Sequence, residues 1–350
     1  MNIFDQNRSW QVFGLSGFLI LVVVLATQNY SAINLNQKTP IVQTLSDGRS
    51  GLFSFRSFSL DRYDIVRGKL ARGPVAITAQ LDLPDTTAKY TKIPAAILLH
   101  GSDGLTRLQS SYAAELRGSG VATLVVDSFS GRGIESTIGQ QDSLAVDAMV
   151  VDAYTALRLL STHPRIDSKS IAVIGWSKGG VASLWSARKF FHKRLAQDRQ
   201  NFAAHVAFYP WCGEREADIS LTGAPVLVLS GELDDWSGTR PCEDFVTQAK
   251  RAGYDARIVV YEDAHHGFDN EGTFTNYLPH AVNWSKCVYL SHETGFVDAA
   301  SGWFSAWPDL KRYLSQCSSQ GVHVASNSRA RKRVRSELVG FLSLILLPTS

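Results

Sequence analysis

Residues 171–180 read IAVIGWSKGG, an apolar run that ends in a serine placed between glycines. The run is short, rich in β-branched residues and free of charge, which is typical of a strand buried on both faces of a sheet. A helical pattern follows, and the G-x-S-x-G segment between the two is typical of a sharp turn that exposes a serine hydroxyl. An ordinary tight turn uses the same residue types, so the meaning of Ser177 depends on the rest of the chain.

Similar apolar runs alternate with amphipathic stretches from about residue 73 onward. The alternation predicts an α/β fold, with a mostly parallel central sheet of about eight strands and helices on both faces. Central strands are expected at residues 95–99, 122–126, 171–174, 204–208, 225–229 and 256–261. Residues 53–58 and 75–83 predict two earlier strands near the sheet edge, antiparallel to the others.

The composition is that of a globular chain with a sizeable core. The 350 residues are 45% hydrophobic and 19% charged, with a net charge of +3. So small a charge gives no reason to expect a nucleic-acid partner, and nothing in the sequence sets the oligomeric state. No repeat or low-complexity linker occurs, which favours one domain over residues 36–350. Within it, the tryptophan-rich residues 269–326 are interpreted as an insertion or lid, packed over the sheet edge or the mouth of the site.

The N-terminal segment differs from the rest of the chain. Residues 12–26 are mostly apolar and include FLILVVVLA at 18–26. The run is short for a membrane span and fits the apolar core of a signal peptide. Residues 1–35 are therefore interpreted as a signal peptide or a retained membrane anchor, and export to the periplasm or the medium is expected. A basic run at 329–335 opens the last helix, where it is either a lipid contact or, more simply, a solvated face.

Four cysteines occur, Cys212, Cys242, Cys287 and Cys317. In an exported protein an even number permits disulfides, and four cysteines allow three pairings. Cys212 and Cys242 each follow a predicted strand at the same end of the sheet, which favours a Cys212–Cys242 bond and, with it, Cys287–Cys317. No cysteine or histidine stands in a pattern with metal-ligand spacing, so no metal or other cofactor is expected.

Two motifs after later strands supply partners for a nucleophilic serine. SGELDDW at 230–236 contains Asp234 and Asp235, and EDAHHGF at 262–268 contains His265 and His266. A serine hydroxyl is a poor nucleophile near neutral pH and needs a base. The order serine, acid, histidine, each just past a strand, is the order in which this type of sheet arranges a catalytic triad.

A glycine-rich segment supplies the other side of the site. HGSDG at 100–104 follows the strand expected at 95–99, and its glycines allow the backbone to approach the serine. The backbone N–H groups of Ser102 and Lys178 are the candidate donors of an oxyanion hole.

Taken together, these motifs resemble the α/β-hydrolase fold and, within it, the dienelactone hydrolase-like family. The resemblance covers roughly residues 70–346, although 269–326 match poorly. The family's namesake enzymes carry cysteine where this chain has Ser177, which favours a general serine esterase or lactonase over the namesake lactone substrate. The matching segments are LLHGSDG at 98–104, VVDSFSGRG at 125–133, IGWSKGG at 174–180, SGELDDW at 230–236 and HHGF at 265–268.

The resemblance also selects within the acid and base motifs. The family's acid stands three residues after a glycine, which favours Asp234 over Asp235. Its base precedes a small residue and an aromatic, which favours His266 over His265. Asp234 is then expected to orient the imidazole, while His266 takes the proton of Ser177 and returns it to the leaving group.

Three other residues are candidates for substrate binding, each with a structural alternative. Arg132 either holds a substrate carboxylate or forms a salt bridge. Trp176 and Trp236 either wall an apolar pocket or pack in the core. The function predicted is a serine hydrolase that cleaves carboxylic esters or lactones through an acyl-enzyme. The alternatives are a peptidase or polymer-ester hydrolase on the same fold, with residues 269–326 as a specificity lid, and a non-enzymatic binding protein.

Overall fold

The computed structural model describes residues 39–68, 73–85, 92–196, 200–272, 274–292, 297–299, 302–304 and 306–347. The predicted signal peptide or anchor at 1–35 lies outside these residues. None of the helices within them is both long enough and apolar enough to span a bilayer.

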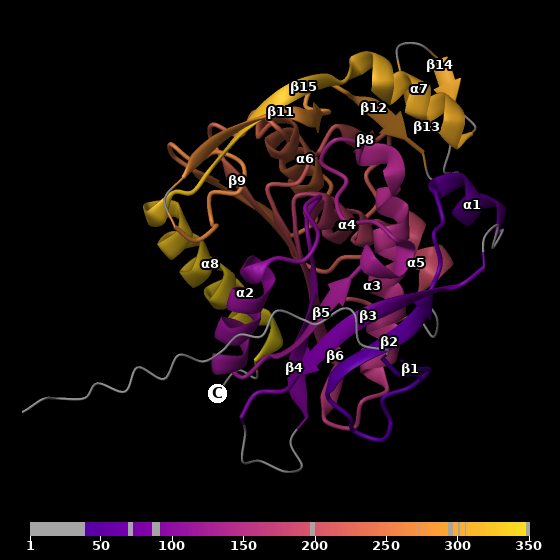
Figure 1. Ribbon diagram of the computed structural model, residues 1–350, viewed down its shortest axis with the longest axis vertical. Coiled ribbons are helices and arrows are strands. Elements are labelled where there is room, and N and C mark those ends of the chain that lie inside the picture. Colours follow the sequence, from indigo (N-terminus) through magenta and orange to yellow (C-terminus); the bar gives the residue numbers. More distant parts are fainter. Residues whose placement is uncertain are drawn as a thin grey trace, which may run out of the picture. The chain divides into compact units, whose positions relative to one another are not determined.

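A nine-stranded sheet forms the centre of the fold, with the strand order β1-β2-β3-β5-β4-β6-β7-β9-β10 (Figure 1). All neighbours from β5 to β10 are parallel, whereas β3 runs antiparallel to both β2 and β5. The predicted fold class is confirmed. The strands are β1 (Ile41–Val42), β2 (Gly51–Ser57), β3 (Val75–Asp82), β4 (Ile93–Leu99), β5 (Ala122–Asp127), β6 (Ile166–Trp176), β7 (Ala204–Phe208), β9 (Val226–Gly231) and β10 (Ala256–Tyr261).

Side chains of the central strands alternate between the two faces of the sheet, and each face carries an apolar core. In β4, Ala95, Ile97 and Leu99 belong to one core, and Ala96 and Leu98 to the other. Figure 1 shows α3 and α5 on one face and α2 and α8 on the opposite face. The helices of the main layer are α1 (Arg62–Arg67), α2 (Arg107–Gly118), α3 (Val146–Ser161), α4 (Lys178–Ser186), α5 (Lys189–Leu195), α6 (Arg240–Arg251) and α8 (Ser328–Leu346).

The last helix, α8, is held to the sheet by an apolar face and by part of its basic run. Val334, Leu338 and Leu342 are buried, and each such side chain contributes about 1.5–3 kcal/mol when it is removed from water. Arg335 pairs with Glu115 of α2 at 2.5 Å and is half-buried against that helix. This member of the basic run therefore has an intramolecular partner.

A smaller layer follows β10, and we call its described residues between Thr275 and Ala325 the cap segment. Strands β11 (Thr275–Asn283) and β15 (Ser319–Ala325) form an antiparallel ribbon. In Figure 1 this ribbon and α7 (Trp307–Cys317) both lie at the top of the view. A second, four-stranded sheet joins the cap segment to β8 (Glu214–Glu216) of the main layer, through β12 (Tyr289–Ser291), β13 (Val297–Ala299) and β14 (Gly302–Phe304).

Two disulfides link consecutive cysteines, as the sequence favoured. Cys212, in the loop after β7, is bonded to Cys242 of α6, with their Cα atoms 5.1 Å apart. Cys287 is bonded to Cys317 at the end of α7, with a Cα separation of 5.2 Å. The first bond ties together two elements beside the loop after β9, and the second closes the part of the cap segment that holds β12, β13, β14 and α7.

Candidate active site

The turn between β6 and α4 holds Ser177 in a backbone conformation that few residues adopt. Its φ is 52° and its ψ is −115°, and its N–H donates to the carbonyl of Phe208 at 2.9 Å. A Cβ at Gly175 would lie 2.0 Å from the carbonyl oxygen of Gly179, and one at Gly179 would lie 2.4 Å from that of His100. The glycines of the motif are therefore required by contact, and the serine stores local strain at the end of the strand.

Substituting Gly175 tests this packing. The Gly175→Ala variant is expected to lose about 1–3 kcal/mol of unfolding free energy, because its methyl group has no space beside the Gly179 carbonyl. Gly340→Ala is the matched control, since the same methyl group meets nothing within 4 Å in α8. Chemical denaturation of both variants measures the difference. Equal stability of the two variants would contradict the close packing of the turn.

His266 and Asp234 meet Ser177 from the loops after β10 and β9. His266 Nε2 lies 2.9 Å from Ser177 Oγ, and His266 Nδ1 lies 2.9 Å from Asp234 Oδ2. The second oxygen of Asp234 accepts the backbone N–H groups of Trp236 and Ser237, at 3.0 and 2.9 Å. A carboxylate held on both oxygens can fix the tautomer of an imidazole, which can then remove the serine proton.

The imidazole of His266 is enclosed by aromatic rings. The ring of Tyr209 lies 4.5 Å from it and that of Trp236 lies 4.7 Å from it, measured between centroids. Only 3% of His266 is exposed. The ring is therefore held in one orientation, with Nε2 directed at the serine.

The neighbouring residues of each motif face elsewhere. Asp235 pairs with His323 of β15, at 2.7 Å, and also accepts the backbone N–H of that residue. Its main-chain carbonyl accepts the side-chain amide of Asn283 at 2.8 Å. The ring of His265 lies 5.9 Å from that of His323. Of the four candidates, the structure thus brings Asp234 and His266 to the serine, while Asp235 holds the cap segment.

The loop after β4 approaches the serine from the opposite side. A Cβ at Gly101 would lie 3.4 Å from the Cβ of Ser177, so the backbone of this loop is in contact with the turn. Ser102 and Lys178 line the same pocket as Ser177. Lys178 is the first residue of α4, and the first N–H groups of a helix have no intrahelical acceptor. Both residues expected to donate from their backbone therefore lie beside Ser177, and their role in an oxyanion hole stays a prediction.

A buried carboxylate, Asp269, connects residues on both sides of the site and was not expected from the sequence. It accepts a hydrogen bond from the hydroxyl of Tyr209 at 2.8 Å. It also accepts one from the hydroxyl of Tyr112 and one from the indole N–H of Trp176, each at 2.9 Å. Burial raises the pKa of Asp269 above its usual value. Trp176 precedes the serine and Tyr209 packs on the imidazole, so Asp269 positions both. In the sequence, Asp269 is connected to the site only by its position three residues after His266.

The structure gives different outcomes for the three predicted substrate-binding residues. Arg132 forms a buried ion pair with Asp152 at 2.7 Å and also donates to Ser59. Because its guanidinium is bonded there and lies outside the pockets at Ser177, the salt bridge replaces the predicted role on substrate. Trp176 is 1% exposed and packs in the core, and it also belongs to the wall of one of the two pockets described next. Trp236 lines both pockets described next.

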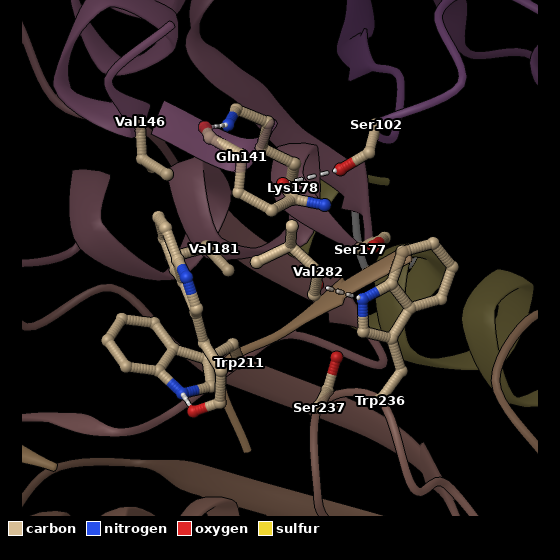
Figure 2. A pocket seen from close by; sticks show the side chains of 11 residues that line it. Ser102, Gln141, Val146, Ser177, Lys178, Val181, Trp211, Trp236, Ser237 and Val282 are labelled. Carbon is tan, nitrogen blue, oxygen red and sulfur yellow. Dashed lines mark hydrogen bonds between the residues drawn. The ribbon is translucent and has the colours of Figure 1, made fainter. Parts of the chain in front are cut away.

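Two pockets meet at Ser177 and Trp236. We call the first the tryptophan pocket; its volume is about 420 Å³, part of it open to solvent, and Trp211, Trp284 and Gln141 belong to its wall (Figure 2). The second, the histidine pocket, has a volume of about 730 Å³ and is lined by His266, Gly101 and the cap residues Leu278 and Val324, among others. The cap segment thus supplies wall residues to both pockets.

The tryptophan pocket contains a buried amine. Lys178 is 5% exposed, and its Nζ donates to the main-chain carbonyl of Gln141. Burial lowers the pKa of Lys178 from 10.5 to about 7, a shift that Asp142 partly opposes through its charge. The side chain therefore anchors the wall of the pocket at Gln141.

No curated protein matches the sequence. Among solved structures, an esterase from the planctomycete Thermogutta terrifontis is similar, with 16% identity over 57% of this chain and 81% of that one and a TM-score of 0.46. A dienelactone hydrolase-like promiscuous phosphotriesterase from metagenomic libraries has 14% identity over 84% of this chain and 99% of that one, with a TM-score of 0.48.

Residues 83–293 match the model of the dienelactone hydrolase family. The match spans more than half of the chain and includes Ser177, Asp234 and His266. The chain therefore belongs to the dienelactone hydrolase family and is a hydrolase with the α/β-hydrolase fold.

Proposed function

We propose that the protein is a serine esterase that cleaves carboxylic esters or lactones through an acyl-enzyme on Ser177. The observation that carries the proposal is the continuous hydrogen-bonded chain from Ser177 through His266 to Asp234, with 2.9 Å at each step. Membership of the dienelactone hydrolase family supports it.

In the first half of the reaction, His266 Nε2 accepts the proton of Ser177 as Oγ attacks the carbonyl carbon of the ester. The carbonyl oxygen gains negative charge and is stabilised by the backbone N–H groups of Ser102 and Lys178. The tetrahedral intermediate then breaks its bond to the alcohol oxygen, which leaves with the proton held by His266. The acyl group remains on Ser177.

In the second half, a water molecule takes the place of the alcohol. His266 removes a proton from the water as its oxygen attacks the acyl carbon, and the proton passes to Ser177 Oγ when the acyl bond breaks. Asp234 accepts the Nδ1–H of the imidazole throughout and stabilises its charged form. Besides the substrate and this water molecule, the steps use only groups of the chain.

Labelling with a fluorophosphonate tests the nucleophile directly. The expected result is a single adduct that peptide mass spectrometry places on Ser177, together with hydrolysis of p-nitrophenyl esters and lactones faster than of aminoacyl p-nitroanilides. Heat-denatured protein is the control and should not react. Faster cleavage of the amides would favour the peptidase alternative. An adduct at another residue, or none, would contradict the proposed function.

We infer that the protein acts outside the reducing cytosol. Disulfides form and persist in oxidising compartments, and both pairs of cysteines in this chain are bonded. The apolar N-terminal segment at 1–35 is then the signal peptide or anchor that brings the chain there.

A further inference from the structure

Gln141 is a buried polar residue of the tryptophan pocket that the proposed mechanism leaves without a role. It begins the short 3₁₀ helix Gln141–Ser143 and is 9% exposed. It lines the same pocket as Ser177, together with Ser102 and Lys178. Its surroundings decide which of its polar atoms faces the pocket.

Two neighbours fix the orientation of Gln141. Ser102 Oγ donates to its side-chain oxygen at 2.9 Å, and Lys178 Nζ donates to its main-chain carbonyl. Because the oxygen of the amide is held at Ser102, the nitrogen is directed away from that residue. Figure 2 shows this nitrogen facing the interior of the pocket. In the part of the chain that the structure describes, no residue accepts a hydrogen bond from it.

Two other donors of this wall are already in use. The indole N–H of Trp211 donates to the carbonyl of Trp284 at 2.8 Å, and that of Trp236 donates to the carbonyl of Val282 at 3.0 Å. The amide nitrogen of Gln141 has two N–H groups and no acceptor capacity. A ligand atom placed against it in this mostly apolar pocket must therefore be an acceptor, because a buried donor left without one costs about 1–3 kcal/mol.

The position of His266 indicates which part of an ester lies in each pocket. The imidazole must protonate the departing alcohol, so the alcohol lies on its side of the serine. His266 lines the histidine pocket and is absent from the wall of the tryptophan pocket. The tryptophan pocket is thus left for the acyl part, with Gln141 beside it.

We propose that Gln141 is a specificity residue that donates a hydrogen bond to an acceptor oxygen in the acyl part of the ester. The inference rests on the proposed function. The substrate class is an ester or lactone whose acyl part carries a second oxygen besides the scissile carbonyl group. The hydrocarbon of that acyl part packs against Trp211, Trp284 and Val146.

Two esters that differ in one atom test the proposal. p-Nitrophenyl methoxyacetate and p-nitrophenyl butyrate have the same leaving group and chain length, but the first has an ether oxygen in place of a methylene. The measured quantity is kcat/KM for the methoxyacetate divided by kcat/KM for the butyrate. This ratio is compared between variants, so that the intrinsic reactivities of the two esters cancel. Gln141→Glu keeps the acceptor for Ser102 and removes both donors, and is expected to lower the ratio about 3- to 10-fold.

Two further variants keep the test decisive. Gln141→Met also removes the donors without adding charge and should lower the ratio in the same direction, with thermal unfolding used to show that each variant is folded. Ser143→Ala, in the same short helix but outside both pockets, is the matched control and should leave the ratio unchanged. An equal loss on both esters in the Gln141 variants, or an unchanged ratio, would overturn the role of Gln141 alone. A native protein that hydrolyses neither ester would overturn the esterase proposal as well.

Discussion

Replacing Ser177 with alanine is expected to lower kcat for p-nitrophenyl butyrate by about 10⁶-fold, because the attacking oxygen is lost and the partners act as a unit. Residual turnover by the oxyanion donors and bound water remains about 10³–10⁴-fold above the rate in water. The fold should survive, since the removed oxygen makes its hydrogen bond to His266 and the strained backbone is set by the surrounding glycines. Steady-state kinetics and a thermal unfolding curve measure both effects.

The matched control for this variant is Ser183→Ala in the same helix. Ser183 is fully buried and its hydroxyl donates to the carbonyl of Val173 at 3.1 Å, away from the pockets. Its loss should change stability by about 1 kcal/mol and leave kcat nearly unchanged. A Ser177→Ala enzyme that retains native kcat would refute the acyl-enzyme mechanism.

Asp234→Asn is expected to lower kcat about 10⁴-fold while the protein remains folded. The asparagine amide presents a donor to His266 Nδ1 in place of the carboxylate oxygen now 2.9 Å away. The imidazole then carries its proton on Nε2 and has no lone pair for the proton of Ser177. The kinetic measurement is kcat at a pH where the native enzyme is fully active.

The adjacent Asp235→Asn variant separates catalysis from attachment of the cap segment. Asp235 pairs with His323, and both side chains are nearly half exposed, so the pair contributes about 0–1 kcal/mol. Its variant should keep kcat within a few-fold of the native value. Similar losses in both variants would mean that the carboxylate facing His266 has no special role.

The central sheet was predictable because its strands are buried on both faces. In β4 and β7 every residue is buried, so both appear in the sequence as short, nearly unbroken apolar runs. The cap segment was not predictable in the same way. Its strands β12, β13 and β14 have three residues each, and their sheet is completed by β8, far earlier in the chain. No local pattern encodes such pairing.

Only those residues of the site that belong to sequence motifs could be predicted. The turn at Ser177 and the loops after β9 and β10 could be located, because parallel strands end at the same edge of the sheet. Asp269 and Gln141 could not, since their partners come from distant parts of the chain. Arg132 shows the same limit, because only the fold reveals that Asp152 is its partner.

The connectivity of the disulfides matters for biosynthesis. Each cysteine is bonded to its immediate neighbour among the four along the chain, at a sequence separation of 30 in both cases. A chain that emerges N-terminus first presents Cys212 and Cys242 together before Cys287 appears. The order of synthesis therefore favours the native pairing over the two alternatives, which would both require Cys212 to wait for a later cysteine.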